Sequence, residues 1–403
     1  MPYNFDGKRI TAETPLNAMQ RGFVSGVTHT KKRERVPTPL AFDVSALPAG
    51  SEVLLIRQYG LGDAILMVPL LRAMHARGLL VDFHTDPRYM PLFAGCPYAR
   101  TVAAVQPGNY FNAADYDAVI DLDRSDEHPA AEEPNRIRHY GRCIGLTLDT
   151  PEACRLELAV TEAERAEAAA FLSTNFLADP LPRPWVAYAW GSKSRSRNWS
   201  NPVHERTIRE LLRAGASVIV LSEEAQKGVP SPPQEGAKLL NLTGAVKNLR
   251  RVAALLAACD GVVAPDTGLF HLAAALGKPV AAYFGPFALS ERTSGAETAL
   301  TVLNEPEARC HLAPCHEYEC PFPDEEGQSP CLMPEWGRLG AWAKGLLKAA
   351  QETTPVAIDP ASLLSVPTGA GNGFVATGTG EPSPVAVSNH ATTRKAVIAA
   401  PKR

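Results

Sequence analysis

The stretch GVVAPDTGLFHLAAALGKPVAAYF, residues 261–284, contains the pattern that decides the fold. Gly261–Ala264 is a short apolar run, which predicts a buried strand, and Leu269–Leu276 is apolar and alanine-rich, which predicts a helix. A further apolar run, Val280–Phe284, predicts the next strand. A strand, a tight turn, a helix and a second strand in that order are typical of a parallel sheet flanked by helices.

The same alternation occurs along much of the chain, on both sides of a proline-rich joint at Asp179–Pro184. Before the joint, the patterns predict the strands Glu52–Arg57, Leu79–Thr85 and Ala118–Leu122 and the helix Asp63–Ala76. After it, they predict the strands Trp185–Ala189 and Ser217–Leu221 and the helices Pro202–Gly215 and Asn248–Ala258. The sequence therefore predicts an α/β fold with two Rossmann-like, doubly wound parallel-sheet domains that face each other across a cleft.

These patterns divide the chain into four parts. We expect a loosely ordered N-terminal extension (1–48), a first Rossmann-like domain (49–182), a second one (183–353) and a disordered tail (354–403). The tail is rich in Gly, Ser, Thr, Pro and Ala and has few large apolar residues, so burial cannot offset the entropy of ordering it.

The composition indicates the class of protein. Of the 403 residues, 45% are apolar and 21% are charged, which is typical of a globular chain with a sizeable core. No apolar run reaches the roughly 18 residues of a membrane span, and the first residues do not resemble a secretory signal. We therefore expect a cytoplasmic protein, and a peripheral contact with the inner face of the membrane stays open.

The net charge of −3 conceals an uneven distribution. The two ends, residues 1–50 and 365–403, each carry a net +3, so the body between them carries −9. So acidic a body argues against a large nucleic-acid surface, and no nucleic-acid partner is expected.

Three loops that follow predicted strands carry polar residues, and ligands of open α/β sheets bind at this end of the strands. The first loop is RQYGLGD, residues 57–63. Gly60 and Gly62 permit a tight turn, and Asp63 stands at the start of a helix. Asp63 is either a functional carboxylate that faces the cleft or a helix cap.

The second loop is APDTGLFH, residues 264–271. A helix start presents free N–H groups and the positive end of the helix dipole, which suits a diphosphate. Thr267 has a side chain that can cap this helix. His271 lies one turn further and is either a ligand-binding residue or an ordinary core histidine.

The third loop is GSKSRSRNW, residues 191–199. It carries Lys193, Arg195 and Arg197 among hydroxyl and amide side chains, a set that can grip phosphate groups. The alternative interpretation is a solvated turn.

Together, these motifs resemble those of glycosyltransferase family 9, which contains the ADP-heptose:lipopolysaccharide heptosyltransferases. The resemblance runs from about residue 52 to about residue 335. It is carried by GLGD with the following MVPLLRA (67–73), by VAPDTGLFHLAAALGKP (263–279) and by FGP (284–286). It implies the GT-B architecture, inversion at the anomeric carbon and no metal or other cofactor required for catalysis.

The resemblance also implies roles for residues. Asp63 would be the general base, and Gly60 and Gly62 would form the loop on the acceptor side. The donor, a nucleotide-diphosphate sugar, would be bound by Lys193, Arg195, Arg197, Asp266, Thr267, Gly268, Leu269 and His271. The family often has a lysine where this chain has Arg197, and Val246–Leu249 leaves the nucleotide base open.

The first guess for the reaction is transfer of heptose from ADP-heptose to a glycan or lipid-linked acceptor such as a lipopolysaccharide core. Two alternatives stay open. The first is a GT-B-type nucleotide-sugar epimerase or hydrolase, and the second is a non-catalytic protein that binds nucleotide sugars or carbohydrates.

Four of the eight cysteines lie close together in the sequence, at Cys310, Cys315, Cys320 and Cys331. This Cys-rich segment, residues 310–331, could hold a structural Zn or Fe ion, with His311 and His316 as substitute ligands. Two disulfides or four free thiols are the alternatives, and a reducing cytoplasm disfavours the disulfides.

Overall fold

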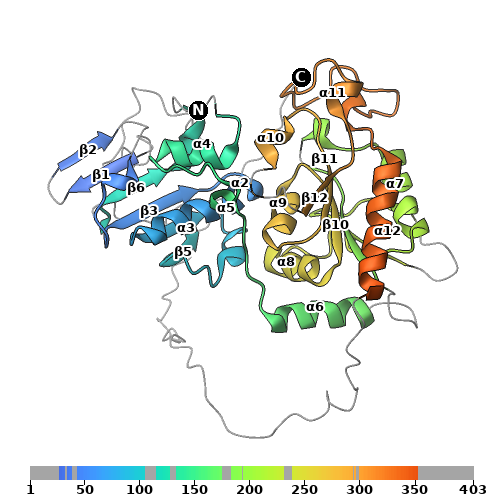
Figure 1. Ribbon diagram of the computed structural model, residues 1–403, viewed down its shortest axis with the longest axis horizontal. Helices are drawn as coiled ribbons and strands as arrows, with labels where there is room; N and C mark the ends of the chain where they lie inside the picture. The colour runs from blue at the N-terminus through green and yellow to red at the C-terminus, as the bar shows by residue number, and fades with distance from the viewer. Residues whose placement is uncertain are drawn as a thin grey trace, which may run out of the picture. The chain divides into compact units, whose positions relative to one another are not determined.

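The structure is a computed structural model, and it describes residues 27–31, 34–38, 43–104, 115–127, 133–174, 183–192, 194–230, 238–293, 295 and 299–352. The predicted tail 354–403, most of the proline-rich joint and Lys193 lie outside the described residues. Residues 1–354 contain two six-stranded sheets (Figure 1).

The first sheet has the strand order β2-β1-β6-β3-β4-β5. Its parallel strands are β3 (Glu52–Arg57), β4 (Leu80–Thr85), β5 (Thr101–Ala104) and β6 (Ala118–Asp121). Two further strands, β1 (Val27–Lys31) and β2 (Glu34–Thr38), extend it as an antiparallel pair beside β6. They lie within residues 1–48, where the sequence pattern predicts no strand.

The second sheet is entirely parallel and has the order β12-β11-β10-β7-β8-β9. Its strands are β7 (Trp185–Ala189), β8 (Ser217–Leu221), β9 (Leu239–Asn241), β10 (Gly261–Pro265), β11 (Val280–Tyr283) and β12 (Leu300–Val302). The order reverses between β7 and β10, as in a doubly wound Rossmann fold. The parallel strands of the first sheet reverse in the same way between β3 and β6, so the predicted α/β fold with two Rossmann-like sheets is confirmed.

The helices of the first half are α2 (Leu61–Ile65), α3 (Val68–Ala76), α4 (Arg136–Cys143), α5 (Pro151–Cys154) and α6 (Glu162–Thr174). Those of the second half are α7 (Asn201–Arg213), α8 (Leu249–Ala258), α9 (Gly268–Ala275), α10 (Leu289–Arg292), α11 (Pro306–Arg309) and α12 (Trp336–Glu352). The prediction of one helix over Asp63–Ala76 is wrong, because α2 and α3 are separate. Pro69 has no N–H to donate to the carbonyl of Ile65, so α2 ends at Ile65.

Helix α6 precedes the proline-rich joint but packs against the second sheet's helix α8, below it in Figure 1. The Arg250 guanidinium of α8 donates to both carboxylate oxygens of Glu164 at 2.7 Å and to the carbonyl of Ala159 at 2.7 Å. The backbone N–H of Leu158 also donates to the carbonyl of Ala275 at the end of α9. The chain therefore crosses to the second sheet near residue 158, before β7 begins.

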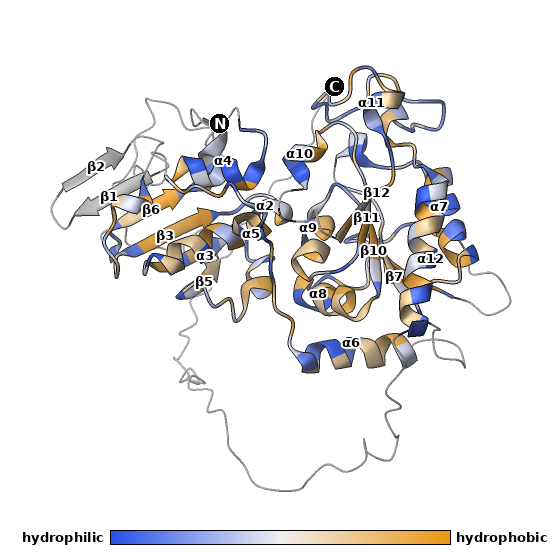
Figure 2. Ribbon diagram, in the orientation of Figure 1, coloured by the Kyte–Doolittle hydropathy of each residue, from blue (hydrophilic) through white to orange (hydrophobic). Residues whose placement is uncertain are grey.

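The strands form the core. Every residue of β7, β8 and β10 is buried, as expected for parallel strands covered on both faces, and the strands are predominantly apolar in Figure 2. None of the helices in the described ranges is both long and apolar enough to cross a membrane.

Candidate active site

The first and second predicted loops meet, because α2 and α9 pack against each other at their N-terminal ends (Figure 1). Glycines make this approach possible. A Cβ atom at Gly62 would lie 2.6 Å from Cδ2 of His271, and one at Gly268 would lie 2.6 Å from Cβ of Leu61. Gly60 has φ +82°, and a Cβ there would lie 2.5 Å from Oδ2 of Asp63. Any side chain at these positions would push the two turns apart or displace Asp63.

Asp63 stands in the first turn of α2 and is held by three side chains of the first sheet's domain. The Tyr140 hydroxyl, on α4, donates to Oδ1 at 2.6 Å. Arg57, the last residue of β3, pairs with Oδ2 at 3.1 Å, and Arg136 of α4 lies 3.9 Å from Oδ1. The Asp63 side chain keeps 21% of its surface exposed, so the fixed carboxylate still reaches solvent.

The charge of Asp63 follows from these partners. Burial raises its pKa, but Arg57, Arg136, the Tyr140 hydrogen bond and the more distant Arg292 outweigh burial and hold the pKa well below its usual range. Asp63 is therefore ionised at neutral pH, the state that a proton acceptor needs.

Arg57 is itself held in place where the strand order of the first sheet reverses, between β3 and β6. Its Nη1 donates to the carbonyl of Leu122 at 2.6 Å and lies 3.7 Å from Oδ1 of Asp123. The Asp123 carboxylate also accepts the backbone N–H of Gln58 at 2.9 Å. Asp123 therefore ties the loop after β6 to the loop that carries Asp63.

On the other side, Asp266 follows β10 and is 3% exposed. Arg197 donates from Nη1 to the Asp266 carbonyl at 2.9 Å and approaches Oδ2 at 3.4 Å. Arg292 of α10 lies with its Nε 3.5 Å from the same Oδ2. The structure thus brings Arg197 of the third loop to Asp266 of the second loop and adds Arg292, an arginine that the sequence did not single out.

Thr267 occupies the N-cap position of α9, but the prediction that its side chain caps the helix is wrong. With φ −145° and ψ 172°, Thr267 makes no side-chain capping bond, and its Oγ1 is buried without a hydrogen-bond partner in the described part of the chain. Nδ1 of His271, which is 5% exposed, also lacks one there. Burial lowers the pKa of His271 to about 4 despite the nearby Asp266 and Asp63, so the ring is neutral at pH 7.

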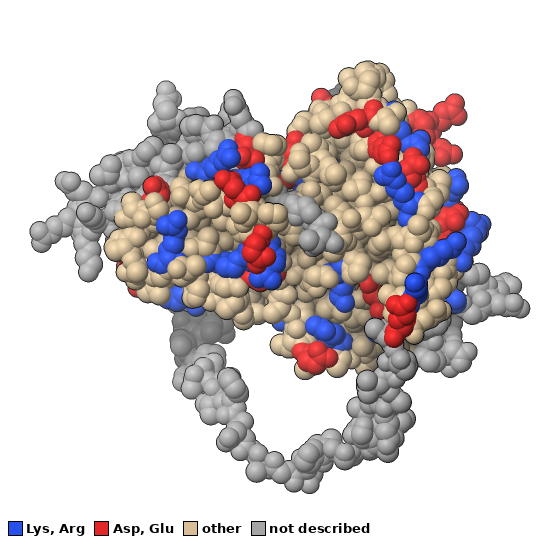
Figure 3. Space-filling view, in the orientation of Figure 1, with Lys and Arg blue, Asp and Glu red and all other residues tan. Residues whose placement is uncertain are grey.

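Not all of the other residues predicted to bind the sugar donor lie beside Asp266 and the start of α9. Leu269 lies half-buried in α9. The Arg195 side chain is 84% exposed and pairs with Glu319 of the Cys-rich segment at 3.4 Å. Charges of both signs lie in small mixed groups on the surface seen in Figure 3.

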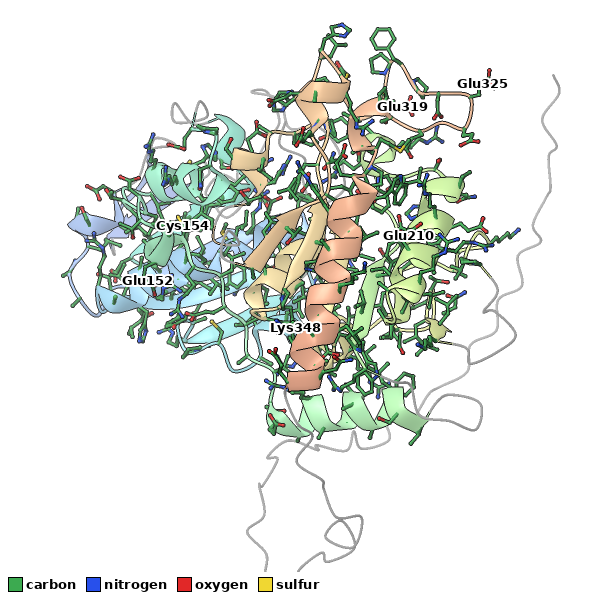
Figure 4. The ribbon with its side chains drawn as sticks, turned by 45° about the vertical axis from the view of Figure 1, so that its right-hand side comes forward. Glu152, Cys154, Glu210, Glu319, Glu325 and Lys348 are labelled. Carbon is green, nitrogen blue, oxygen red and sulfur yellow. The ribbon has the colours of Figure 1, made fainter. Side chains whose placement is uncertain are left out.

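The Cys-rich segment packs against the loop that carries Arg197. The Ser196 N–H donates to the Tyr318 carbonyl at 3.0 Å, and the Trp199 indole donates at 2.6 Å to the carbonyl of Leu332, the residue directly after the segment. Figure 4 shows Glu319 and Glu325 at the outer end of the segment. The segment therefore braces the third loop from outside.

All four cysteines of the segment are reduced and border one small cavity of about 10 Å³. The alternative of two disulfides, which the sequence already disfavours, is therefore not realised in this segment, which is described in full. Burial, with smaller effects from Cys310, Cys320 and Cys315, raises the pKa of Cys331 to about 12. As they stand, no three Cys, His, Asp or Glu side chains of the described residues are arranged to hold a metal ion.

Comparison with known proteins gives the family. The family model for glycosyltransferase family 9 (heptosyltransferase) matches residues 112–324, more than half of the chain. The chain belongs to glycosyltransferase family 9. The matched range includes Asp266–His271 and ends within the Cys-rich segment, and it begins after the Gly-Leu-Gly-Asp loop.

Two curated relatives support this assignment. Lipopolysaccharide heptosyltransferase 2 from Escherichia coli K12 is 26% identical over 137 residues, which cover 32% of this chain and 38% of that protein. Lipopolysaccharide heptosyltransferase 2 from Salmonella typhimurium is 28% identical over 111 residues, which cover 26% of this chain and 32% of that protein. The matches thus span about a third of the relatives' length.

Solved structures confirm the predicted GT-B fold. A glycosyl transferase of family 9 from Veillonella parvula superposes with a TM-score of 0.53 at 15% identity, over 77% of this chain and 99% of that one. The ADP-heptose LPS heptosyltransferase II of E. coli gives 0.52 at 17% identity, over 74% and 99%. At these identities, the similarity establishes the architecture.

Proposed function

We propose that this member of family 9 transfers a sugar from a nucleotide-diphosphate sugar to a hydroxyl group of a glycan acceptor, with inversion and without a catalytic metal. One observation carries the proposal. An ionised carboxylate, Asp63, lies across a glycine-lined contact from a helix start where Thr267 Oγ1 and His271 Nδ1 are buried without partners. A base on one side and unused polar groups on the other suit an acceptor hydroxyl and a diphosphate leaving group.

In the proposed reaction, the Asp63 carboxylate accepts the proton of the acceptor hydroxyl as its oxygen attacks the anomeric carbon. The new carbon–oxygen bond forms opposite the bond to the diphosphate, which breaks with its electron pair and inverts the anomeric centre. Asp63 ends protonated and the nucleoside diphosphate leaves as an anion. The start of α9 and the Arg197 guanidinium would stabilise the negative charge that develops there.

The names of the relatives guide the choice of substrates. The E. coli and S. typhimurium relatives are lipopolysaccharide heptosyltransferases, so ADP-heptose as donor and a lipopolysaccharide-type glycan as acceptor are proposed first. An acceptor of this kind is attached to a lipid, so we also propose that the enzyme acts at the cytoplasmic face of the membrane through a peripheral contact.

We further propose that the four cysteines hold a structural Zn or Fe ion. Four thiols around one cavity are a donor set that suits either metal, and they would have to turn toward its centre to bind it. Elemental analysis of protein purified without chelator should then give about one Zn or Fe per chain by the four-ligand stoichiometry of such sites. A metal-free protein with four titratable thiols in the segment would contradict the proposal.

The donor proposal is tested by calorimetric titration with ADP, UDP, GDP and CDP, with and without EDTA. We expect one nucleotide to bind more tightly than the others and EDTA to leave its affinity unchanged. Preference for ADP would support heptose. Binding of none of the four would contradict the proposed function and favour a non-catalytic protein. Donor turnover without transfer to any acceptor would favour the epimerase or hydrolase alternative.

A further inference from the structure

We infer that Arg292 and Arg197 form a two-arginine clamp for the diphosphate of the donor, with Phe287 as their common platform. The inference rests on the proposed function, and it adds a binding residue, Arg292, that the sequence motifs do not contain. The clamp is assembled from two separate parts of the chain, the loop after β7 and the short helix α10.

The two guanidinium groups converge on the same partners. Both approach Oδ2 of Asp266, Arg197 with Nη1 at 3.4 Å and Arg292 with Nε at 3.5 Å. Both also lie over the ring of Phe287, with Cζ 5.6 Å from its centroid for Arg197 and 4.1 Å for Arg292. An aromatic face attracts cations and limits their movement, so the ring holds the two groups beside one carboxylate.

The pair has more donors than this carboxylate can use. Two guanidinium groups carry about ten N–H donors, whereas one carboxylate offers about four lone pairs. The Nε atom of Arg197 is buried without a hydrogen-bond partner in the described residues. The Nε atom of Arg292 is also buried, and although it lies 3.5 Å from Oδ2 of Asp266, it makes no hydrogen bond there; the Arg292 side chain is only 12% exposed. Buried donors that lack acceptors are costly, and an incoming anion supplies acceptors.

The charge at the clamp also favours an anion. Two cations share the single negative charge of Asp266, and the neutral His271 beside them adds none. Arg197, Arg292 and Asp266 together therefore carry one net positive charge, next to the positive end of α9 and the unpartnered Thr267 hydroxyl. A diphosphate has several oxygens that can each accept two hydrogen bonds. Two planar guanidinium groups can donate to these oxygens in pairs, which a single lysine ammonium cannot do.

The test is calorimetric titration of the full chain with inorganic diphosphate, which carries neither base nor sugar, and with the nucleotide that binds best. We expect Arg292→Gln and Arg197→Gln each to weaken diphosphate binding about 10- to 100-fold, the loss of one charge-assisted contact. Arg292→Lys should fall between wild type and Arg292→Gln, because it keeps the charge and loses the fork. The double variant should lose less than the product of the two single losses, because the two residues grip one ligand.

Arg209→Gln is the matched control, since Arg209 is an exposed arginine on α7 that pairs with Glu205. Its diphosphate affinity should equal that of wild type, and thermal unfolding of all variants should show that they are folded. Wild-type affinity in a folded Arg292→Gln variant, with loss in Arg197→Gln, would overturn the clamp and leave the proposed function standing. Failure of wild type to bind either inorganic diphosphate or any nucleotide would overturn both.

Discussion

The two turns that meet between the sheets contrast in how their polar groups are satisfied. Around Asp63, each carboxylate oxygen has a partner, from Tyr140 on one side and Arg57 on the other. Around Thr267 and His271, buried polar atoms lack partners among the described residues. Both turns begin a helix and both are lined by glycine, so local backbone geometry does not explain the difference.

The difference indicates a division of labour. A base must be held in place and kept ionised before the acceptor arrives, so its partners belong to the protein. A site for a charged donor must keep its hydrogen-bonding capacity unused until the ligand binds.

The largest expected effect is that of Asp63→Asn. The amide keeps the shape of the carboxylate but cannot accept a proton, so we expect transfer to fall by about 10²- to 10⁴-fold, the usual contribution of a general base. Nucleotide affinity measured by calorimetry should be retained. Asp149→Asn, at an exposed carboxylate in the same half of the chain, is the control that should leave transfer unchanged. Unchanged transfer in Asp63→Asn would place the base elsewhere.

A smaller effect is expected from Tyr140→Phe, which keeps the ring under Arg57 and removes only the hydroxyl that donates to Asp63. Without this hydrogen bond, the pKa of Asp63 rises, although Arg57 and Arg136 still hold it down. Activity requires the ionised form and falls as the pH drops through this pKa. The acid limb of kcat/KM should therefore move to higher pH. At neutral pH Asp63 stays ionised, so the loss there comes from looser positioning of the carboxylate and should be no more than roughly tenfold for one hydrogen bond to a charged group.

Tyr116→Phe is the matched control, because its hydroxyl donates in the same way to a different carboxylate, Asp82, at 3.0 Å. It should leave the pH profile of kcat/KM as in wild type. If the profiles of Tyr140→Phe and wild type coincide, Tyr140 has no part in setting the charge of Asp63.

Local sequence patterns predicted the sheets, because strand periodicity and turn glycines are local signals, whereas the contact between the first and second loops comes from the fold. They also marked Asp63, Arg197 and Asp266 as candidate site residues. The partners of these residues come from far along the chain. Tyr140 lies 77 residues from Asp63, and no periodicity marks it as a hydroxyl donor to that carboxylate.

Arg292 was missed for a similar reason. It sits in a short helix after FGP, among charged and hydroxyl side chains typical of a solvated turn, and only the fold brings it to Asp266. Arg195 is the opposite case, a residue that the sequence proposed for donor binding and that the structure pairs with Glu319. A loop with three cations does not indicate which of the side chains turns inward. The pairing of Arg195 with Glu319 depends on the Cys-rich segment, more than a hundred residues away.

The smallest expected effect concerns His271, at the turn whose buried polar atoms lack partners. It is a change in how steeply the free energy of unfolding depends on pH. His271 has a pKa of about 4 in the folded chain and about 6.5 when unfolded. Between these values, the unfolded chain binds a proton that the folded chain does not, so stability is complete above about pH 6.5 and falls as the pH drops. The loss reaches about 1.4 kcal/mol per pH unit, or about 2 kcal/mol at pH 5. Chemical denaturation from pH 7 to pH 5 should show a flatter curve for His271→Gln than for wild type.

His204 is a buried histidine on α7 that stacks on Trp190, with a pKa that burial lowers to about 3, and it provides the matched comparison. His204→Gln should flatten the stability curve by a similar amount. The two variants should differ when inorganic diphosphate is added. An anion at the start of α9 favours the protonated form of His271 and raises its pKa. Diphosphate should therefore reduce the slope of stability against pH in wild type and in His204→Gln, and should leave the slope of His271→Gln unchanged. Equal responses of both variants to diphosphate would mean that the anion binds away from His271, and the contrast between the two turns would then reflect packing alone.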